Sequence, residues 1–241
     1  TFDRYMELVL YHPQYGYYTH PRKRIGKQGD FITSVSIGRC FGKLLARHLV
    51  SPVSRLAGGS GDLLLVEPGA EDGCLALDVM HELEQILPET VYKRLCYVAI
   101  EPFPSKKQHL MDVFGDADSR RFRVVSGLQE LVGSRGVLVA NEVLDAMPVK
   151  RLRLRNGKWL QICVANSQEK GEGFQEEELA IEDPELARIT GAFPLALEDG
   201  FTIELNMGLK AWFQDLAQAF DMLYCCLIDY GLCGDEVFSP A

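Results

Sequence analysis

The chain has 241 residues, 47% of them hydrophobic, and a formal net charge of −9 from 25 basic and 34 acidic side chains. This length can bury a full hydrophobic core without disulfide or metal staples, in one large α/β domain or a domain with an insertion. The acidic balance argues against non-specific nucleic-acid binding, which needs a basic face. The negative charge suits a cationic protein or peptide partner. The alternative is that the charge has no partner, because mild acidity is common in soluble proteins.

The seven cysteines indicate neither a disulfide framework nor a zinc site. Their number is odd, and no two are spaced as C-x-x-C. Several lie in apolar runs, as Cys96 and Cys225 do, which predicts reduced, buried thiols in a cytosolic-type compartment. No apolar run reaches the ~18 residues that cross a bilayer, and the N-terminus does not resemble a signal peptide. We therefore expect no bound metal and no membrane insertion.

Residues 1–60 are interpreted as an N-terminal extension or lid. The first 35 residues are rich in aromatic residues and glycine, and the run from Tyr15 to Tyr18 could either cover a ligand or pack into a core. A helix is predicted next, because apolar residues recur there at helical spacing. Its apolar face is predicted to consist of Ile37, Phe41, Leu44, Leu45 and Leu49.

Residues 61–149 alternate buried strands with helices and are interpreted as a cofactor-binding core. Leu63 to Val66 is apolar on both faces, as in a parallel strand covered by helices. The helix that follows, Cys74 to Leu87, is stopped by Pro88. This order predicts a mostly parallel α/β sheet with helices on both faces. Further strands are predicted at Cys96 to Ile100, Arg123 to Val125 and Gly136 to Ala140.

Residues 150–205 are expected to form an antiparallel insertion. Lys150 to Arg155 and Lys158 to Val164 alternate polar and apolar residues on either side of Asn156 and Gly157, a pair that suits a type I′ hairpin turn. The charged stretch from Gln168 to Glu178 is predicted to be a mobile loop.

The insertion is predicted to end with a strand from Phe201 to Leu205. Residues 206–241 are then expected to return to the core, with a further strand from Leu223 to Asp229. The helix between them is predicted from an apolar face of Leu209, Trp212, Phe213, Leu216 and Phe220. The whole chain, residues 1–241, is thus interpreted as a single domain, and we expect it to be truncated because it ends soon after the last strand.

The turn from Glu67 to Gly73 directly follows the first buried strand and has the form E-x-G-x-x-x-G. Glycine there lets a ligand approach the backbone, and the N–H groups of the next helix point toward it. Glu67, at the strand end, can accept the amino group of an amino-acid-like ligand. The alternative is an ordinary strand-to-helix turn that needs two glycines. The missing G-x-G-x-x-G argues against a dinucleotide.

Polar residues also end the next two strands. Glu101 closes the second strand, 34 positions after Glu67, where a carboxylate can accept hydrogen bonds from ribose hydroxyls. Ser126, just past the third strand, could line the same pocket. The alternatives are a solvated charge for Glu101 and a plain loop residue for Ser126.

Asn141, Glu142 and Asp145 emerge after the strand that ends at Ala140. Ligands of such folds bind at the carboxyl edge of the parallel sheet, so these three polar groups predict a second part of the site. Helix capping is the alternative, because asparagine caps helices and glutamate favours their N-termini. Capping alone does not explain why Pro148 ends the turn so soon.

A series of motifs runs in order along nearly the whole chain. They are Tyr5-Met6, Leu10-Tyr11, Pro13, Gly16-Tyr17-Tyr18, Gly29-Asp30-Phe31-x-Thr33, Phe41-Gly42, Glu67-x-Gly69-Ala70, Asn141-Glu142-x-x-Asp145-Ala146-x-Pro148, Glu204 and Asp229-Tyr230-Gly231. This series resembles the MidA-like methyltransferase family, which includes a mitochondrial protein-arginine methyltransferase.

The resemblance implies a Rossmann-like class I methyltransferase fold, S-adenosyl-L-methionine as cofactor and a protein acceptor methylated on arginine. The compartment would be the cytoplasm in a bacterium and the mitochondrial matrix in a eukaryote. The residues assigned to the cofactor are Glu67, Gly69, Ala70, Gly73, Glu101 and Ser126. The residues assigned to the edge facing the transferred methyl group are Asn141, Glu142, Asp145 and Asp30.

Two residues of the glycine turn depart from the family pattern. Glu71 stands where the family usually has glycine, and its carboxylate could either crowd the cofactor or point outward. Pro68 removes a backbone donor. The alternative function is therefore a catalytically degenerate domain that keeps the fold as a binding or assembly factor. A nicotinamide-dependent oxidoreductase is a third interpretation, which the missing dinucleotide motif argues against.

Overall fold

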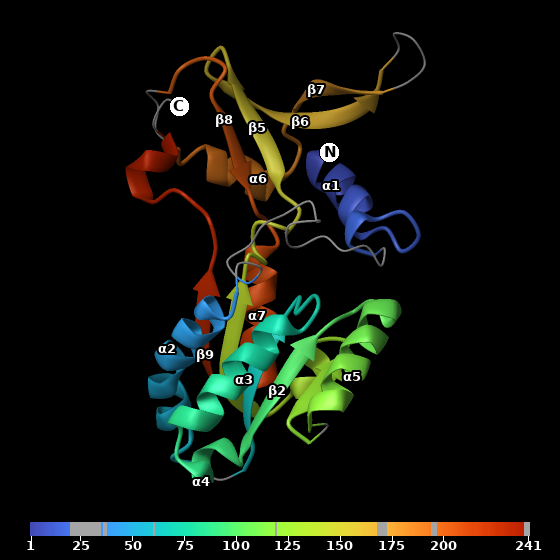
Figure 1. The fold of residues 1–241 in the computed structure, drawn as a ribbon. Helices are drawn as coiled ribbons and strands as arrows, with labels where there is room; N and C mark the ends of the chain where they lie inside the picture. The colour runs from blue at the N-terminus through green and yellow to red at the C-terminus, as the bar shows by residue number, and fades with distance from the viewer. Residues whose placement is uncertain are drawn as a thin grey trace. The chain divides into compact units, whose positions relative to one another are not determined.

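The computed structural model describes residues 1–19, 35, 38–59, 61–118, 120–167, 173–193 and 197–238. The chain divides into two compact units, which are described in turn (Figure 1). The parallel-sheet unit comprises Pro21–Leu144 and Ala211–Asp229. The antiparallel-sheet unit comprises Thr1–His20, Asp145–Lys210 and Tyr230–Ala241. The organisation of residues 1–241 as one domain with an N-terminal lid and an insertion stays a prediction.

Five strands form the sheet of the parallel-sheet unit. β1 (Leu63–Pro68) lies at its centre, between β2 (Leu95–Ile100) and β4 (Ser134–Asn141). β3 (Phe122–Val125) extends the β2 side, and β9 (Phe220–Ile228) extends the β4 side. All four pairings are parallel, which confirms the predicted sheet. The order β3-β2-β1-β4-β9 reverses at β1, and ligands of such sheets bind at the carboxyl ends of the strands at this reversal.

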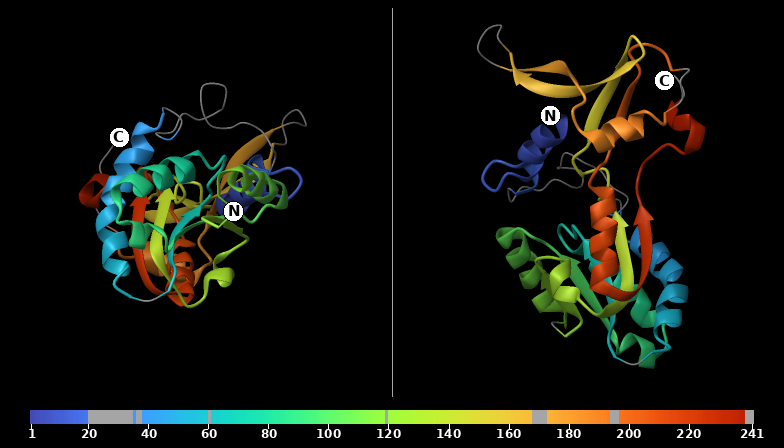
Figure 2. Two further views of the ribbon diagram at one scale, coloured as in Figure 1. Left: turned by 60° about the horizontal axis from the view of Figure 1, so that its bottom comes forward. Right: turned by 180° about the vertical axis from the view of Figure 1, so that it is seen from behind.

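Helices cover both faces of this sheet, because its strands are apolar on both sides. The helical elements are α2 (Cys40–Leu56), α3 (Cys74–Ile86), α4 (Glu89–Tyr92), α5 (Pro104–Asp118), η3 (Leu128–Leu131) and α7 (Leu209–Ala219). Leu63 and Leu65 face the side of α2, α3 and α5, whereas Leu64 and Val66 face the side of α7. Figures 1 and 2 show α2 and α7 on opposite sides of the sheet. Among the described residues, no helix combines the length and apolar content needed to span a bilayer.

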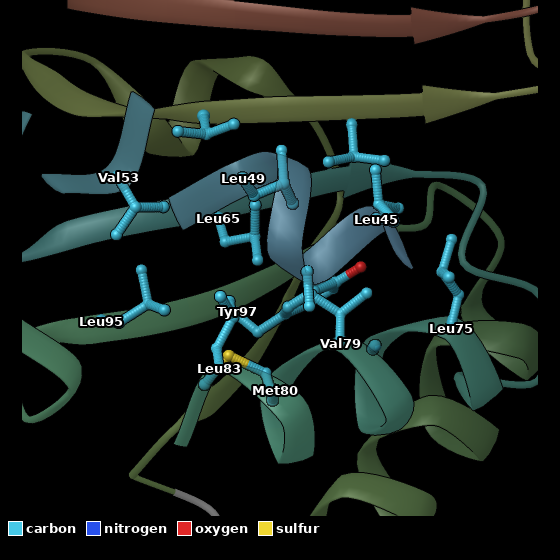
Figure 3. Packing of buried hydrophobic residues seen from close by; sticks show 14 of the residues in the cluster. Leu45, Leu49, Val53, Leu65, Leu75, Val79, Met80, Leu83, Leu95 and Tyr97 are labelled. Carbon is cyan, nitrogen blue, oxygen red and sulfur yellow. The ribbon is translucent and has the colours of Figure 1, made fainter. Parts of the chain in front are cut away.

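The core on the α2 and α3 side is closely packed (Figure 3). Leu45 and Leu49 of α2 and Val79 and Leu83 of α3 are all at most 5% exposed. Tyr97 of β2, at 1% exposed, lies among these aliphatic side chains, and Figure 3 shows its hydroxyl oxygen within the same cluster. The Tyr97 hydroxyl is therefore a buried polar group, which needs a hydrogen-bond partner.

The predicted apolar helix faces are wrong at three positions. Leu44 is 63% exposed, although its neighbour Leu45 is buried. Consecutive residues differ by about 100° around a helix, so only one of the two can face the core. Phe213 of α7 is 42% exposed for the same reason, because its neighbour Trp212 packs against the core. Phe220 is buried but begins β9 and is not part of the helix. Ile37 lies outside the described residues.

The prediction of buried thiols is also wrong for most cysteines. All seven thiols are free, but only Cys163 is buried. Cys225 is exposed and Cys226 is half-buried, although both lie in an apolar run. They belong to β9, which lies at the edge of the sheet, so its side chains are less covered than those of the central strands.

α3 begins directly after Gly73, a position that excludes a side chain. Its φ is 74°, in the left-handed region that favours glycine. A Cβ there would lie 2.9 Å from Cε1 of Phe114 on α5, whose ring is 2% exposed and stacks on Phe122 of β3 at 4.7 Å. Glycine at this position therefore lets α5 pack against the start of α3.

The antiparallel-sheet unit is built on a sheet of order β7-β6-β5-β8. Its strands are β5 (Lys150–Arg155), β6 (Lys158–Asn166), β7 (Phe174–Ala180) and β8 (Thr202–Leu205). Asn156 and Gly157 have φ angles of 49° and 74°, and Arg155 pairs with Lys158 across the turn. The predicted type I′ hairpin is thus confirmed.

The predicted mobile loop from Gln168 to Glu178 is wrong for its second half. Residues 168–172 lie outside the described residues, but Phe174–Ala180 forms β7 and pairs with β6 along its whole length. Two of the charged residues that suggested a loop, Glu176 and Glu178, are instead partners in ion pairs across the sheet.

These ion pairs join three arginines of β5 to two glutamates of β7. Arg151 and Arg153 donate to Glu176 at 2.7 and 2.9 Å. Arg153 and Arg155 donate to Glu178, both at 2.8 Å. The hydrogen bonds from Arg155 and Arg153 lower the pKa of Glu178 to about 2. The network thus joins strands that are not hydrogen-bonded to each other.

Short helices lie on the two sides of this sheet. The helical elements are α1 (Phe2–Tyr11), η1 (Tyr17–Thr19), α6 (Pro184–Thr190) and η4 (Gly234–Phe238). On one side, Leu186 of α6 packs against Leu152 and Ile203 of the sheet. On the side of the ion pairs, the Arg151 guanidinium lies 4.9 Å from the centre of the Phe2 ring of α1.

The stability of the antiparallel-sheet unit is expected to depend on pH through Glu178. Its folded pKa lies below the ordinary value of 4.5, so its stabilisation is present above about pH 4.5 and is lost as the pH falls toward about 2. Glu178→Gln should lower stability at neutral pH and flatten the acid slope in this window. Trp159 fluorescence in a Trp212→Phe background measures the unfolding. Glu177→Gln, on the opposite face of β7, is the control, and an unchanged slope in Glu178→Gln would contradict the prediction.

Gly73→Ala is expected to destabilise the parallel-sheet unit by about 1–3 kcal/mol, because the new methyl group overpacks against Phe114 and the backbone is left-handed. The matched control is Gly115→Ala, in the exposed part of α5, where a Cβ meets nothing within 4 Å. That change should raise stability by roughly 0.5–1 kcal/mol through helix propensity. Urea unfolding followed by Trp212 fluorescence in a Trp159→Phe background compares them, and equal effects would refute the argument.

Candidate functional site

The turn between β1 and α3 has left-handed residues at every second position. The φ angles are 72° at Gly69, 47° at Glu71 and 74° at Gly73. The N–H of Gly69 donates to the carbonyl of Ile100 at the end of β2, at 3.1 Å. Apart from its chain neighbours, nothing among the described residues lies within 4 Å of a Cβ built at Gly69. The backbone there has room for a ligand to approach closely.

Hydrogen bonds within the turn fix its shape. Ala70 is buried, and its carbonyl accepts the N–H of Gly73 at 2.7 Å. The carboxylate of Asp72 accepts the N–H of Cys74, the first residue of α3, at 3.0 Å. Both hydrogen bonds are made before the helix begins, so the turn and the start of α3 are held as one piece.

Glu71 points toward α5. Its Oε1 accepts a hydrogen bond from Nζ of Lys106 at 2.8 Å. A non-glycine residue in the left-handed region costs roughly 1–2 kcal/mol, so glycine would be the less strained residue here. The ion pair with Lys106 therefore directs the Glu71 carboxylate toward α5.

Glu67 is a buried carboxylate. It is 5% exposed, and its Oε2 accepts a hydrogen bond from the Tyr97 hydroxyl at 2.7 Å. Burial, which disfavours the charged form, raises the pKa of Glu67 to about 7 despite this hydrogen bond. The nearby charge of Asp72 raises it further. Near neutral pH, Glu67 can therefore hold or release a proton.

Glu101 is also buried, at 2% exposed, which rules out the alternative of a solvated charge. Its Oε1 accepts the backbone N–H of Phe103 at 2.9 Å, and its Oε2 lies 3.4 Å from Nζ of Lys106. The N–H of Glu101 donates to Val125 at the end of β3. Ser126 follows there, and its hydroxyl accepts from Nζ of Lys107 at 2.9 Å.

The parallel register brings the predicted cofactor residues to one edge. Pro68 at the end of β1 is level with Ile100 of β2, and Ile100 is level with Val125 of β3. The residues gathered at these three strand ends and in the adjoining turn are Glu67, Gly69, Ala70, Gly73, Glu101 and Ser126. They form a row across the carboxyl ends of three adjacent strands.

Asn141 and Glu142 lie at the carboxyl end of β4, beside this row. No helix follows them among residues 142–149, so the helix-capping alternative is wrong. Glu142 has a φ of 51°, and its N–H donates to Ile228 of β9 at 2.8 Å. The N–H of Leu144 donates to Oδ2 of Asp229 at 2.8 Å. The strained loop after β4 is thus fastened to the end of β9.

Two predicted residues lie outside the described part of the parallel-sheet unit. Asp145 belongs to the antiparallel-sheet unit, next to Ala146, whose carbonyl accepts the Tyr11 hydroxyl at 2.7 Å. Burial and then the charges of Tyr18 and Asp145 raise the pKa of Tyr11. Asp30 lies outside the described residues. The roles of Asp145 and Asp30 stay predictions.

The sequence interpretation missed three residues of this edge. Tyr97 holds Glu67, Lys106 lies between Glu71 and Glu101, and Asp229 fastens the loop after β4. For Asp229 a signal was present, because a carboxylate directly after a parallel strand lies at the ligand-binding edge. Tyr97 and Lys106 lie within a strand and a helix, where sequence spacing gives no such signal.

A cavity of about 530 Å³ lies elsewhere in the parallel-sheet unit. Arg39, Asp78, His81 and Glu84 line it together with residues of α4, α5 and β3. None of the predicted site residues is in its wall. Nor do the described residues hold a group of three or more His, Cys, Asp or Glu side chains arranged to bind a metal ion.

Residues 44–238 match the model of a family described as "Putative S-adenosyl-L-methionine-dependent methyltransferase". A relative from Drosophila melanogaster, named protein arginine methyltransferase NDUFAF7 homolog, mitochondrial, is 32% identical over 177 residues, which are 66% of this chain and 40% of that protein. A relative from Bos taurus, named protein arginine methyltransferase NDUFAF7, mitochondrial, is 38% identical over 183 residues, which are 68% of this chain and 41% of that protein.

Two crystal structures from Burkholderia thailandensis share the fold. One, bound to S-adenosyl-homocysteine, superposes on 98% of this chain with a TM-score of 0.83 at 25% identity. The other, a native structure, superposes on 98% of this chain with a TM-score of 0.78 at 27% identity. They confirm the predicted Rossmann-like methyltransferase fold.

The chain spans only part of these proteins, about 40% of the curated relatives' length and 59% of the first crystal structure's chain. The family model, however, matches well over half of this chain. The chain therefore belongs to this family of S-adenosyl-L-methionine-dependent methyltransferases.

Proposed function

We propose that this chain forms the cofactor-binding part of an S-adenosyl-L-methionine-dependent methyltransferase that acts on arginine in a protein substrate. The open left-handed turn at Gly69, between the buried carboxylates of Glu67 and Glu101, is the observation that supports this most strongly. Two carboxylates on adjacent strands suit a ligand with an amino group at one end and a ribose at the other. The S-adenosyl-homocysteine bound in the Burkholderia thailandensis structure also supports the proposal.

The side chains of this edge fit that cofactor. A buried carboxylate such as Glu67 is costly to ionise, so a ligand amino group would supply the positive charge that its surroundings lack. Among the described residues, the approach of Lys106 to Oε2 of Glu101 is 3.4 Å long, which leaves this oxygen able to accept from ribose hydroxyls. The cofactor-binding set is Glu67, Gly69, Ala70, Gly73, Glu101 and Ser126. When bound, the cofactor supplies an electrophilic methyl group for direct displacement.

We assign the acceptor side of the reaction to the loop after β4 and to the N-terminal segment. Arginine stays protonated because its pKa exceeds ~12, so carboxylates must hold the guanidinium and help discharge a proton. Glu142 and Asp145 supply such carboxylates, Asn141 supplies an amide, and Asp30 is a further contributor. The residues' main contribution to rate is the alignment of acceptor and donor with water excluded.

The second candidate function is a binding or assembly factor without catalysis. It is favoured by Glu71, which stands where the family usually has glycine. Its ion pair with Lys106 weakens that argument, because the carboxylate is engaged toward α5. A nicotinamide-dependent oxidoreductase is not favoured, since the turn lacks G-x-G-x-x-G. The relatives' names include "mitochondrial", so we propose the mitochondrial matrix for a eukaryotic source and the cytoplasm for a bacterial one.

The function is tested by binding and transfer together. Calorimetric titration with S-adenosyl-L-methionine should give micromolar binding, and radiolabelled cofactor added to lysate should label a protein band on arginine. Asp145→Asn should abolish labelling and leave cofactor affinity within about twofold, because it acts on the acceptor. Asp215→Asn, on the exposed side of α7, is the control. No binding at millimolar cofactor would favour the non-catalytic alternative, and full turnover by Asp145→Asn would refute its assignment.

Cofactor binding is expected to release a proton from Glu67. Its pKa of about 7 in the free protein should fall when an amino group binds, so affinity should rise with pH up to about 7 and level off above it. Calorimetry near pH 6.5 in two buffers with different ionisation enthalpies counts the protons released. Glu67→Gln should remove this release and weaken binding. Identical proton counts for the wild type and Glu67→Gln would contradict the role of Glu67.

A further inference from the structure

Lys106, on the first turn of α5, lies between two carboxylates. Its Nζ is 2.8 Å from Oε1 of Glu71 and 3.4 Å from Oε2 of Glu101. The Lys106 side chain is only 11% exposed, so water screens its charge weakly. The shorter of the two distances shows which carboxylate holds the ammonium group.

We propose that Glu71 is a positioning residue: it holds Lys106 back from Glu101 and so keeps the Glu101 carboxylate available to the ribose of the cofactor. This inference rests on the proposed function, in which Glu101 accepts from ribose hydroxyls. Glu71 departs from the family pattern, but in this role it supports cofactor binding and does not crowd the cofactor.

The geometry at Glu101 supports this role. One of its oxygens already accepts the N–H of Phe103, which leaves Oε2 as the acceptor for a ligand. A direct charge-assisted hydrogen bond is about 2.7–2.9 Å long, and the 3.4 Å between Oε2 and Lys106 is longer than that. Lys106 is thus close enough to occupy Oε2 after a small movement, and Glu71 opposes that movement.

The charges around the turn explain why a counter-ion is needed. A buried ammonium group must be paired, and without Glu71 the nearest carboxylate to Lys106 is Glu101. Lys107, the next residue, is directed to Ser126 at the end of β3 instead. Removal of Glu71 should therefore move Lys106 onto Glu101.

The backbone supports the same interpretation. Glu71 has a φ of 47°, a conformation that glycine adopts at lower cost. Glycine would relieve the strain but supplies no carboxylate for Lys106. The two effects of a Glu71→Gly change are therefore separable, because one concerns the backbone of the free protein and the other concerns ligand affinity.

The test is a double-mutant cycle on Glu71 and Lys106, with S-adenosyl-homocysteine as the calorimetric ligand because it has the ribose and no transferable methyl group. Glu71→Gly and Glu71→Gln should each weaken binding about tenfold, the effect of losing one good hydrogen bond. Lys106→Met alone should bind within about twofold of the wild type. Adding Lys106→Met to either Glu71 variant should restore the affinity, since no cation then remains to occupy Glu101.

Two further measurements separate positioning from a merely structural role. The melting temperature of ligand-free Glu71→Gly should stay equal or rise, because glycine relieves the left-handed strain, while its affinity falls. The matched control is Lys93→Met, which removes the exposed ion pair with Glu89 at 2.5 Å and should change neither quantity. Glu71→Gln separates the lost charge from the changed backbone.

Each outcome decides the inference. Unchanged binding by Glu71→Gly would overturn it, and tighter binding would overturn it and favour crowding of the cofactor. Weaker binding that Lys106→Met does not restore would also overturn it, because the effect would then not act through Lys106. If the wild type does not bind S-adenosyl-homocysteine at millimolar concentration, the proposed function fails together with this inference. Binding by the wild type without rescue leaves the proposed function standing and removes only the role of Glu71.

Discussion

The site depends on one backbone constraint, the sharp change of direction between β1 and α3. The chain leaves the centre of a sheet that is covered on both faces and enters a helix within five residues, with left-handed conformations at Gly69, Glu71 and Gly73. The absence of a side chain at Gly73 lets α5 approach, and that approach brings Lys106 to the edge of the sheet. The open backbone at Gly69 and the charges around it therefore follow from a single turn.

The same edge contains carboxylates that are costly to bury, and each is stabilised differently. Tyr97 donates to Glu67, whose pKa is nevertheless raised, whereas Glu101 has a backbone N–H and a nearby ammonium group. Two buried acids at one edge of a sheet are a costly arrangement in isolation. A ligand that offers a cation to one and hydroxyl donors to the other would offset that cost, which is why these acids are interpreted in terms of binding.

Much of the fold could be predicted from local patterns, because apolar runs and an Asn156-Gly157 pair act over a few residues. Predictions failed where the outcome depends on distant parts of the chain. Cys225 lies in an apolar run but is exposed because β9 is at the edge of the sheet. Glu176 and Glu178 form part of a strand, β7, whose charges are paired by arginines of β5. In the site, strand-end residues could be predicted, whereas Lys106 could not, since only the packing of α5 places it there.

The hydrogen bond between Leu144 and Asp229 also has a mechanical consequence. These two residues are the last ones in the parallel-sheet unit before the chain continues into the antiparallel-sheet unit, at Asp145 and again at Tyr230. Two of the connecting segments therefore leave from one shared anchor point. A force transmitted along either segment is applied first to this anchor point, beside Asn141 and Glu142 at the end of β4, so tension in the connections acts on the geometry of the loop after β4.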